Sequence, residues 1–240
     1  IFLDYIIKIN SFPKTPVKIL AQGMEKRLGG SAAVASFTIK KLGQNISFIG
    51  RLGDDDVSKL LIGELNKFKI QYKDSIVIKG AQSSQSYVYE DKDGERLLAA
   101  FNEKKLLNNK KLPKISFTKK TTFMTDLRWI EATLYIAKNC HKKNLNLIVD
   151  LDNYKLDSKV KQIINLSSHP IFSETGAIEY TKSKSIIRSL KKMSSIKNKF
   201  YAITAGKKGV YWIENGIIFN CKPPKIKAVL FLKSNLLRYL

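Results

Sequence analysis

Two kinds of hydrophobic pattern alternate along this chain. Short runs of apolar and β-branched residues predict buried strands, and longer stretches in which apolar residues recur every three or four positions predict helices. The predicted strands are 1–9, 45–49, 121–125, 146–150, 170–173 and 200–204. The predicted helices are 31–42, 55–69, 129–142, 157–166 and 183–194. Strands that alternate with helices in this way favour an α/β fold whose sheet is mostly parallel and covered on both faces.

Two segments depart from this alternation. In 84–101, apolar residues flank the turn Asp91–Gly94, and this pattern predicts a β-hairpin. A second hairpin is predicted around Asn215-Gly216. Together with 18–28, the segment 84–101 predicts a small β appendage on the α/β core. Since no repeat, low-complexity tract or linker divides the chain, we expect residues 1–240 to form one domain.

The composition is that of an ordinary globular protein. The 240 residues are 44% hydrophobic and 26% charged, which excludes global disorder. No apolar run approaches the ~18 residues that a membrane span needs. The cysteines, Cys140 and Cys221, cannot form a disulfide framework, and no basic leader precedes the first apolar run. We therefore expect a cytoplasmic protein.

The net charge of +23 has two interpretations, and most of the excess lies in 101–240. One is a basic face for nucleic acid or another polyanion. The other is a solvated coat of lysines. Only 6 of the 43 basic residues are arginines, whereas base reading and bidentate phosphate binding favour arginine. The composition favours the coat, and nucleic acid is not the expected partner.

Common catalytic motifs are missing from the sequence. There is no Walker A loop, no G-x-G-x-x-G after a strand, and no pair of cysteines at zinc-binding spacing, so no metal-ligating cluster is predicted. Three glycine-rich segments remain: 29–33, 50–55 and 203–210. Each also fits a plain structural role, as helix–sheet packing, helix capping and a hairpin turn respectively.

The order of these segments is more specific than any one of them. The ordered features are Asp4 in the first strand, Gly29-Gly30-Ser31-Ala32-Ala33, Gly50-Arg51-Leu52-Gly53-Asp54-Asp55, Asp93-Gly94-Glu95-Arg96, and Thr204-Ala205-Gly206-Lys207-Lys208-Gly209. This series resembles the ribokinase/phosphofructokinase-B (PfkB) family of sugar and nucleoside kinases from residue 1 to about 229. The stretch 126–129, with Asp150-Leu151-Asp152, looks most like the branch acting on ketohexose-type sugars, including sulfofructose kinases.

The resemblance implies a Rossmann-like three-layer core with a β-sheet lid formed by about 18–28 and 84–101. A sugar would lie between lid and core, and ATP with Mg²⁺ over the C-terminal half. The lid pairs two subunits in some relatives, which implies a possible homodimer. Matched by position, the sugar-binding residues would be Asp4, Gly29, Gly30, Lys18, Arg27 and Arg128, with 86–89 closing over the sugar. Thr204, Gly206 and Gly209 would border the nucleotide.

Three departures from the family pattern bear on activity. The family's D-T-x-G-A-G-D motif, which supplies the anion hole and the catalytic base, should begin after Val229, but 230–240 contain no Gly and no Asp. Val34 stands where the family has a sugar-binding asparagine. The N-x-x-E element falls on 173–176, where neither its asparagine nor its glutamate is kept, and Glu174 or Glu179 is the candidate substitute.

From these departures we expect a truncated carbohydrate kinase in which no residue serves as catalytic base and which is therefore inactive. A frame shift near 229–230 is a hypothesis for its origin. The alternatives are a non-catalytic sugar-binding remnant and a basic polyanion-binding protein that uses the same fold.

Overall fold

The computed structural model describes residues 1–152, 154–195 and 199–224. The chain divides into two compact units, Ile1–Pro113 and the residues from Lys114 onward. Each unit has its own sheet, and each is described by itself.

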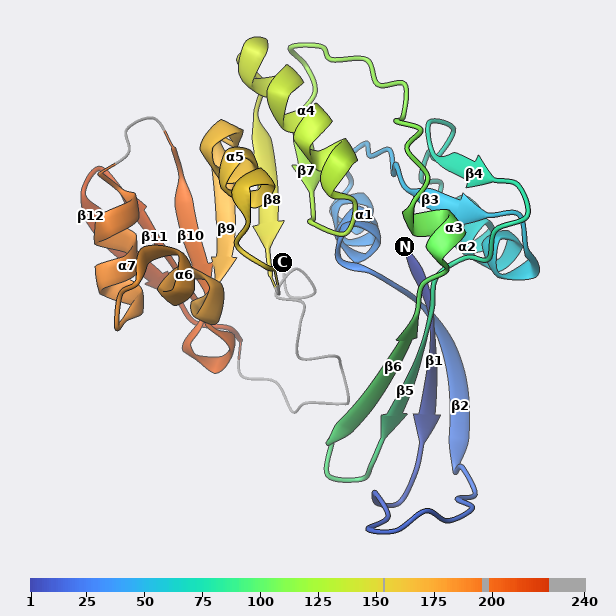
Figure 1. Cartoon of the computed structure of the whole chain (residues 1–240). Helices are drawn as coiled ribbons and strands as arrows, with labels where there is room; N and C mark the ends of the chain where they lie inside the picture. The colour runs from blue at the N-terminus through green and yellow to red at the C-terminus, as the bar shows by residue number, and fades with distance from the viewer. Residues whose placement is uncertain (153, 196–198, 225–240) are drawn as a thin grey trace. The chain divides into compact units, whose positions relative to one another are not determined.

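A four-stranded sheet, called the lid sheet below, dominates the first unit (Figure 1). Its strands are β1 (Phe2–Lys8), β2 (Gly23–Gly29), β5 (Gln85–Glu90) and β6 (Arg96–Phe101), in the order β2-β1-β5-β6. β1 and β5 are parallel, and the two outer pairs are antiparallel. The predicted hairpin 84–101 is therefore confirmed as β5 and β6.

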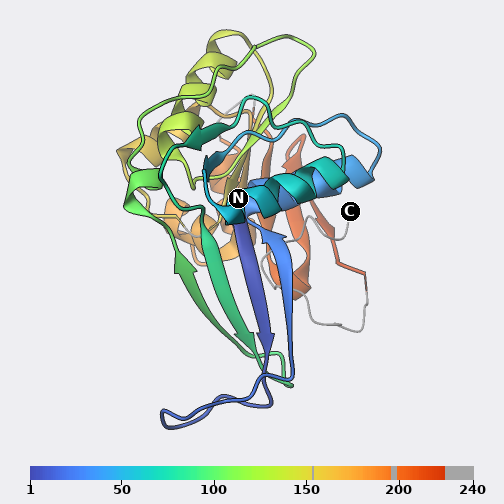
Figure 2. The same cartoon turned by 90° about the vertical axis from the view of Figure 1, so that its right-hand side faces the viewer.

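Helices and a small sheet complete the first unit. The elements are α1 (Ser31–Lys41), α2 (Asp56–Lys67), the parallel pair β3 (Arg51–Gly53) and β4 (Ile76–Ile78), and the one-turn helix α3 (Lys104–Leu107). α1 and α2 meet through the buried Ala33 and Leu65, and the rings of Phe37 and Phe68 pack edge to face at 4.6 Å. Figure 2 shows the long strands of the lid sheet extending away from these helices.

The second unit is built on a six-stranded sheet of order β12-β11-β10-β9-β8-β7. Its strands are β7 (Phe123–Thr125), β8 (Leu147–Leu151), β9 (His169–Ser173), β10 (Tyr201–Thr204), β11 (Val210–Glu214) and β12 (Ile217–Cys221). β7 to β10 are parallel, and β11 and β12 add an antiparallel hairpin.

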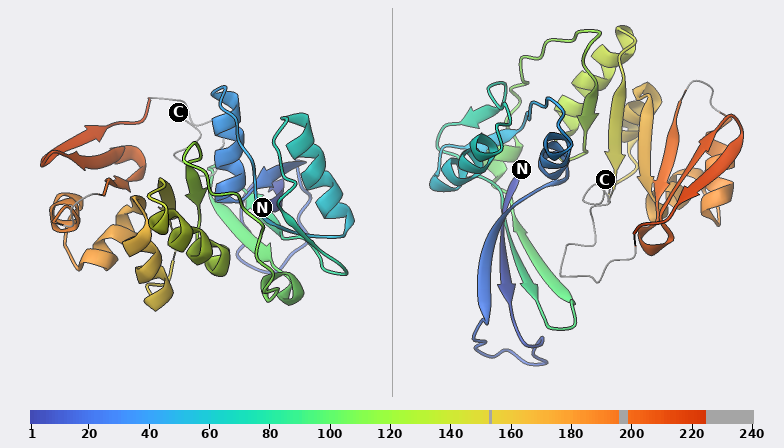
Figure 3. Two further views of the ribbon diagram at one scale, coloured as in Figure 1. Left: turned by 90° about the horizontal axis from the view of Figure 1, so that it is seen from above. Right: turned by 180° about the vertical axis from the view of Figure 1, so that it is seen from behind.

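Four helices lie on the same face of this sheet (Figures 1 and 3). They are α4 (Ile130–Lys142), α5 (Ser158–Leu166), α6 (Glu174–Thr181) and α7 (Ile186–Met193). Leu147, Val149 and Leu151 alternate along β8 and are fully buried within the core of this unit. The alternation arises because every second side chain of a strand points to the same face.

The structure corrects several sequence predictions. The segment 45–49 is not a strand: it contributes a single bridge between Ser47 and Gln71, and the paired strand begins at Arg51. β2 begins at Gly23, so 18–22 lies in a loop. The helix α6 was not predicted. The chain divides into two compact units, and the expectation of one domain over 1–240 stays a prediction.

Candidate functional site

Asp4 lies in the middle of β1, and its carboxylate is held inside the lid sheet. Only 7% of the residue is exposed. Its Oδ1 accepts a hydrogen bond of 2.5 Å from the Ser86 hydroxyl, which stands beside it in the parallel register of β1 and β5. A buried carboxylate must be hydrogen-bonded because an unpaired one is costly. Asp4 is therefore built into the sheet.

Gly29 and Gly30 close the lid sheet next to Asp4. A Cβ at Gly29 would overlap the Asp4 carboxylate, so a glycine here makes room for that side chain. Gly30 has φ +92° and is the N-cap of α1. The sequence predicted that these glycines let a sugar approach the backbone. In the structure, the absence of a side chain at Gly29 leaves room for the Asp4 carboxylate.

Arg27 lies beside Asp4 in the lid sheet, whereas Lys18 lies in the loop between β1 and β2. Arg27 is the partner of Asp4 in the antiparallel register of β1 and β2, and its guanidinium donates to Glu25 Oε1 at 2.6 Å. Lys18 is exposed in the loop that joins Lys8, the end of β1, to Gly23, the start of β2. The structure thus brings Arg27, but not Lys18, beside Asp4.

The segment 50–55 has a structural role. The Gly53 amide donates to Ser83 Oγ at 2.9 Å, and a Cβ at Gly53 would overlap the Ala81 carbonyl. Asp55 caps α2 by accepting from the Ser58 amide at 3.0 Å. Burial alone would raise the pKa of Asp55, but hydrogen bonds from the Ser83 amide and hydroxyl and from the Ser58 amide outweigh it and lower the pKa. The capping interpretation of this aspartate is confirmed.

In the second unit, the predicted nucleotide residues lie at the carboxyl edge of the parallel strands. Thr204 ends β10 beside Ser173, the last residue of β9. A short 3₁₀ turn, Gly206–Lys208, follows. Gly206 has φ +52° and open space around it, whereas a Cβ at Gly209 (φ +93°) would overlap the Cys221 carbonyl. Ligands of α/β proteins bind at this edge of the sheet.

Glu174 stands at the same edge, at the start of α6. Its carboxylate accepts hydrogen bonds of 2.7 and 3.1 Å from the Lys208 ammonium, so the β10–β11 turn and the helix start are joined. Sequence reasoning had not singled out Lys208 as a site residue. A lysine between the two glycines of the turn was the available signal, but without coordinates nothing connected it with Glu174.

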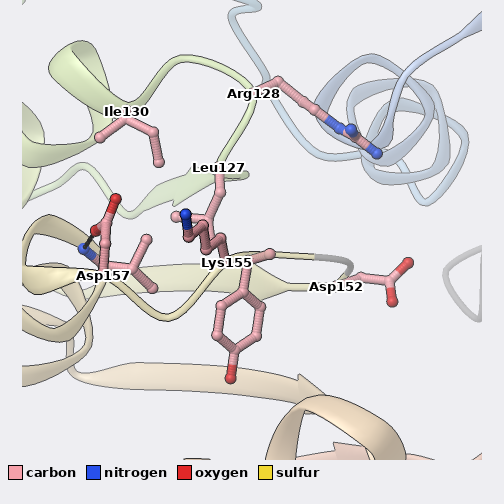
Figure 4. Close-up of a pocket in the computed structure, with 8 residues that line it drawn as sticks. Leu127, Arg128, Ile130, Asp152, Lys155 and Asp157 are labelled. Carbon is pink, nitrogen blue, oxygen red and sulfur yellow. Dashed lines mark hydrogen bonds between the residues drawn. The ribbon is translucent and has the colours of Figure 1, made fainter.

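Arg128 lines a shallow cavity of ≈ 220 Å³ between the ends of β7 and β8 (Figure 4). The cavity is lined by Leu127, Arg128, Ile130, Asp152, Tyr154, Lys155, Asp157 and Val160. Asp157 caps α5, accepting from the Val160 amide at 2.8 Å. The Arg128 side chain points away from Lys155, so these two cations do not converge on one point (Figure 4).

Among residues 1–152, 154–195 and 199–224, no group of three or more His, Cys, Asp and Glu side chains is placed to hold a metal ion. In the same ranges, no helix is long and apolar enough to cross a membrane. Glu174, the residue expected to take part in metal handling, lies at the carboxyl edge of the parallel strands with its carboxylate paired to the Lys208 ammonium.

Known proteins share both the sequence pattern and the fold. The profile described as pfkB family carbohydrate kinase matches residues 2–229. A probable fructokinase-2 of Arabidopsis thaliana is 33% identical over 76 residues, which are 32% of this chain and 23% of the relative. The chain thus spans less than a quarter of that protein's length.

Solved ribokinases have a similar structure at low sequence identity. The ribokinase of Thermotoga maritima matches with a TM-score of 0.74 and 20% identity over 95% of this chain and 77% of that chain. A ribokinase of Arabidopsis thaliana, solved with ribose and ATP, matches with a TM-score of 0.74 and 17% identity, covering 92% of this chain and 75% of that chain. These matches confirm the predicted ribokinase-like α/β fold, and the profile match shows that this chain belongs to the pfkB family of carbohydrate kinases.

Proposed function

We propose that this chain is the sugar- and nucleotide-binding part of a kinase that transfers a phosphoryl group from ATP to a ketohexose. The observation that carries the proposal is the buried Asp4 carboxylate, oriented by Ser86 and seated against Gly29. Carboxylates accept hydrogen bonds from sugar hydroxyls, as the family resemblance implies for this position. The fructokinase similarity supports a ketohexose as the first sugar to test.

Each described residue has a limited task in this proposal. Asp4 would accept hydrogen bonds from hydroxyls of the sugar and so orient it. Thr204, Gly206 and Gly209 would border the nucleotide, where the open space at Gly206 admits a ligand to the backbone. Glu174 would hold Mg²⁺. When bound, ATP supplies the transferable phosphoryl group and Mg²⁺ neutralises its charge.

A binding titration tests the sugar site. We expect calorimetry to detect fructose, and we expect Asp4→Ala to weaken fructose binding at least tenfold, since a charged hydrogen-bond acceptor is lost. Asp56→Ala is the matched control, because it removes a carboxylate that is 93% exposed at the start of α2. An affinity that is unchanged in Asp4→Ala would contradict the proposed site, and ribose and nucleosides in the same panel would identify another sugar class.

We further propose that these 240 residues bind without turnover. Phosphoryl transfer needs an acceptor for the hydroxyl proton and donors for the phosphoryl charge, and the sequence contains no D-T-x-G-A-G-D motif to supply them. A coupled ADP-release assay with ATP, Mg²⁺ and fructose should therefore remain at background. Turnover abolished by a single carboxylate substitution would instead identify another base.

Arg128 is proposed to contact an anionic substituent of the sugar. It lines the cavity at the carboxyl ends of β7 and β8, and arginine favours phosphate, sulfonate and carboxylate groups. If so, fructose 6-phosphate or sulfofructose should bind more tightly than fructose, and Arg128→Ala should remove the difference. Equal losses for charged and neutral sugars would rule out this role.

The lid sheet is also proposed to pair two copies of the chain. On one face of β5 and β6, three large apolar side chains are exposed: Tyr87, Leu97 and Phe101. Exposed apolar patches of this kind mark interaction surfaces.

A further inference from the structure

The hydroxyl of Ser86, a residue of β5, donates its hydrogen bond to the Asp4 carboxylate on the neighbouring strand β1. The residue is 3% exposed, and its Oγ donates to Asp4 Oδ1 at 2.5 Å. A hydrogen bond to a charged acceptor is roughly twice as strong as a neutral one. The contact therefore restricts the rotation of the Asp4 side chain.

The strands on both sides keep Ser86 in place. On the opposite face of the same strand pair, the rings of Tyr5 and Tyr87 stack at 5.1 Å with planes 9° apart. Each ring belongs to the residue that directly follows Asp4 or Ser86. β6 pairs with β5 along its other edge. Because the aromatic stack holds the register of β1 and β5, the hydroxyl and the carboxylate remain opposite one another.

Gly29 limits the same carboxylate from another direction. A Cβ at this position would overlap the Asp4 carboxylate atoms, so the carboxylate lies directly against the backbone of β2. The strand β5 thus supplies a hydrogen-bond donor to the Asp4 carboxylate, and β2 leaves the space that this carboxylate occupies. Together they favour one orientation of the Asp4 side chain.

We propose that Ser86 is a positioning residue of the sugar site: it orients the Asp4 carboxylate before the sugar binds. This inference rests on the proposed function, because it assumes that Asp4 accepts hydrogen bonds from a sugar. A side chain that is already oriented loses less conformational freedom on binding, so its hydrogen bonds contribute more to affinity. Ser86 itself need not touch the sugar.

The test compares two isosteric substitutions. Ser86→Thr keeps the hydroxyl and Ser86→Val replaces it with a methyl group, so both add bulk to the strand in the same way. We expect the fructose dissociation constant to rise about tenfold in Ser86→Val and to stay within about twofold of wild type in Ser86→Thr, a difference of the size reported for hydrogen bonds to charged groups. Melting temperatures of both variants show whether the lid sheet is intact.

Ser84→Ala is the matched control. Ser84 is also buried, at 6% exposure, but its hydroxyl donates to Asn102 Oδ1 at 2.8 Å and not to Asp4. Its loss should leave the fructose dissociation constant unchanged. If Ser86→Val binds fructose as tightly as Ser86→Thr, the positioning role is wrong while the sugar site stands. If the wild-type chain binds no sugar, the proposed function is wrong and the positioning role falls with it.

Discussion

Glu90 and Arg96 form an ion pair at the far end of the β5–β6 hairpin. Glu90 is 3% exposed, and the Arg96 Nε donates to its Oε2 at 2.7 Å. Removing one partner of a buried pair leaves an uncompensated charge, so we expect Arg96→Ala to lower the free energy of unfolding by about 3–5 kcal/mol. Urea denaturation followed by circular dichroism measures the change.

A surface pair nearby provides the control for this prediction. Lys8 and Glu25 lie 4.0 Å apart, and both side chains are more than a third exposed. Exposed pairs contribute about 0–1 kcal/mol, so Lys8→Ala should have little effect. If the Arg96→Ala loss were equally small, the Glu90 carboxylate would have to reach solvent in the variant.

Two tyrosines of the second unit, the fully buried Tyr201 and the partly buried Tyr154, differ in their hydrogen bonding. Within the described residues, the fully buried Tyr201 hydroxyl has no hydrogen-bond partner, and burial raises its pKa to about 12. The Tyr154 hydroxyl donates to the Gly176 carbonyl at 3.0 Å. Since an unsatisfied buried hydroxyl is unfavourable, Tyr201→Phe should be neutral or stabilising by about 1 kcal/mol, whereas Tyr154→Phe should destabilise by about 1 kcal/mol. Thermal denaturation of the two variants distinguishes them, and a destabilised Tyr201→Phe would reveal a partner for that hydroxyl.

At the scale of single elements, the cap of α2 makes stability depend on pH. The folded state lowers the pKa of Asp55 below its ordinary value of 3.8, so the unfolded chain binds the proton more readily. The contribution of Asp55 is therefore fully present above about pH 4 and is lost as the pH falls through the folded pKa.

The variant Asp55→Asn tests this dependence, because asparagine still caps a helix but does not titrate in this range. At pH 7 the variant should be less stable than wild type by about 1 kcal/mol. The difference should shrink as the pH falls through the folded pKa of Asp55, because below that pKa Asp55 is protonated in both the folded and the unfolded state. Thermal melts from pH 2 to 7 give the curve, and a constant difference across it would contradict the cap's role.

Elements in which apolar residues recur with a clear period could be predicted from the sequence, and elements without such a period could not. The helix 157–166 carries a clear apolar stripe and was found within one residue, as α5. In contrast, α6 contains Gly176 and buries it with Ala177, so no polar–apolar period distinguishes this helix from a loop. The three-residue strands β3 and β4 are too short for alternation to appear.

The candidate site was predictable only in part, for a related reason. Asp4, Gly29 and Gly30 stand in a recognisable order along the chain. Residues 86–89 were expected to close over the sugar, but the contact of Ser86 with Asp4 depends on the register of β1 with β5, which joins residues 82 positions apart. A serine in a strand has no local signal of such a contact, so its role required the structure.

At the scale of the whole molecule, the proposed pairing of two copies through the lid sheet can be tested on β6. β6 is an end strand of the lid sheet, and Leu97 is 59% exposed on it, on the same face as Tyr87 and Phe101. If the lid pairs two subunits, Leu97→Lys should convert a dimer into a monomer, because a buried unpaired charge opposes association. Light scattering behind size-exclusion chromatography measures this change.

Met24→Lys is the matched control for the lid interface. Met24 is 63% exposed and lies on β2, the strand at the other end of the same sheet. A substitution here should leave the oligomeric state unchanged. A wild-type chain that is already monomeric at high concentration would exclude the lid dimer.

The unequal ends of the lid sheet have a consequence for how assembly stops. β2 carries Glu25, Lys26 and Arg27 in succession, and charges of this kind discourage a strand edge from pairing. From Leu97 to Phe101, β6 carries none. If β6 paired with β2 of the next copy, every addition would leave a fresh edge and a filament would grow. If β6 pairs with β6 of a second copy, neither copy keeps a free β6 edge, and growth ends at two copies. The charges on β2 thus favour a closed pair over an open-ended polymer.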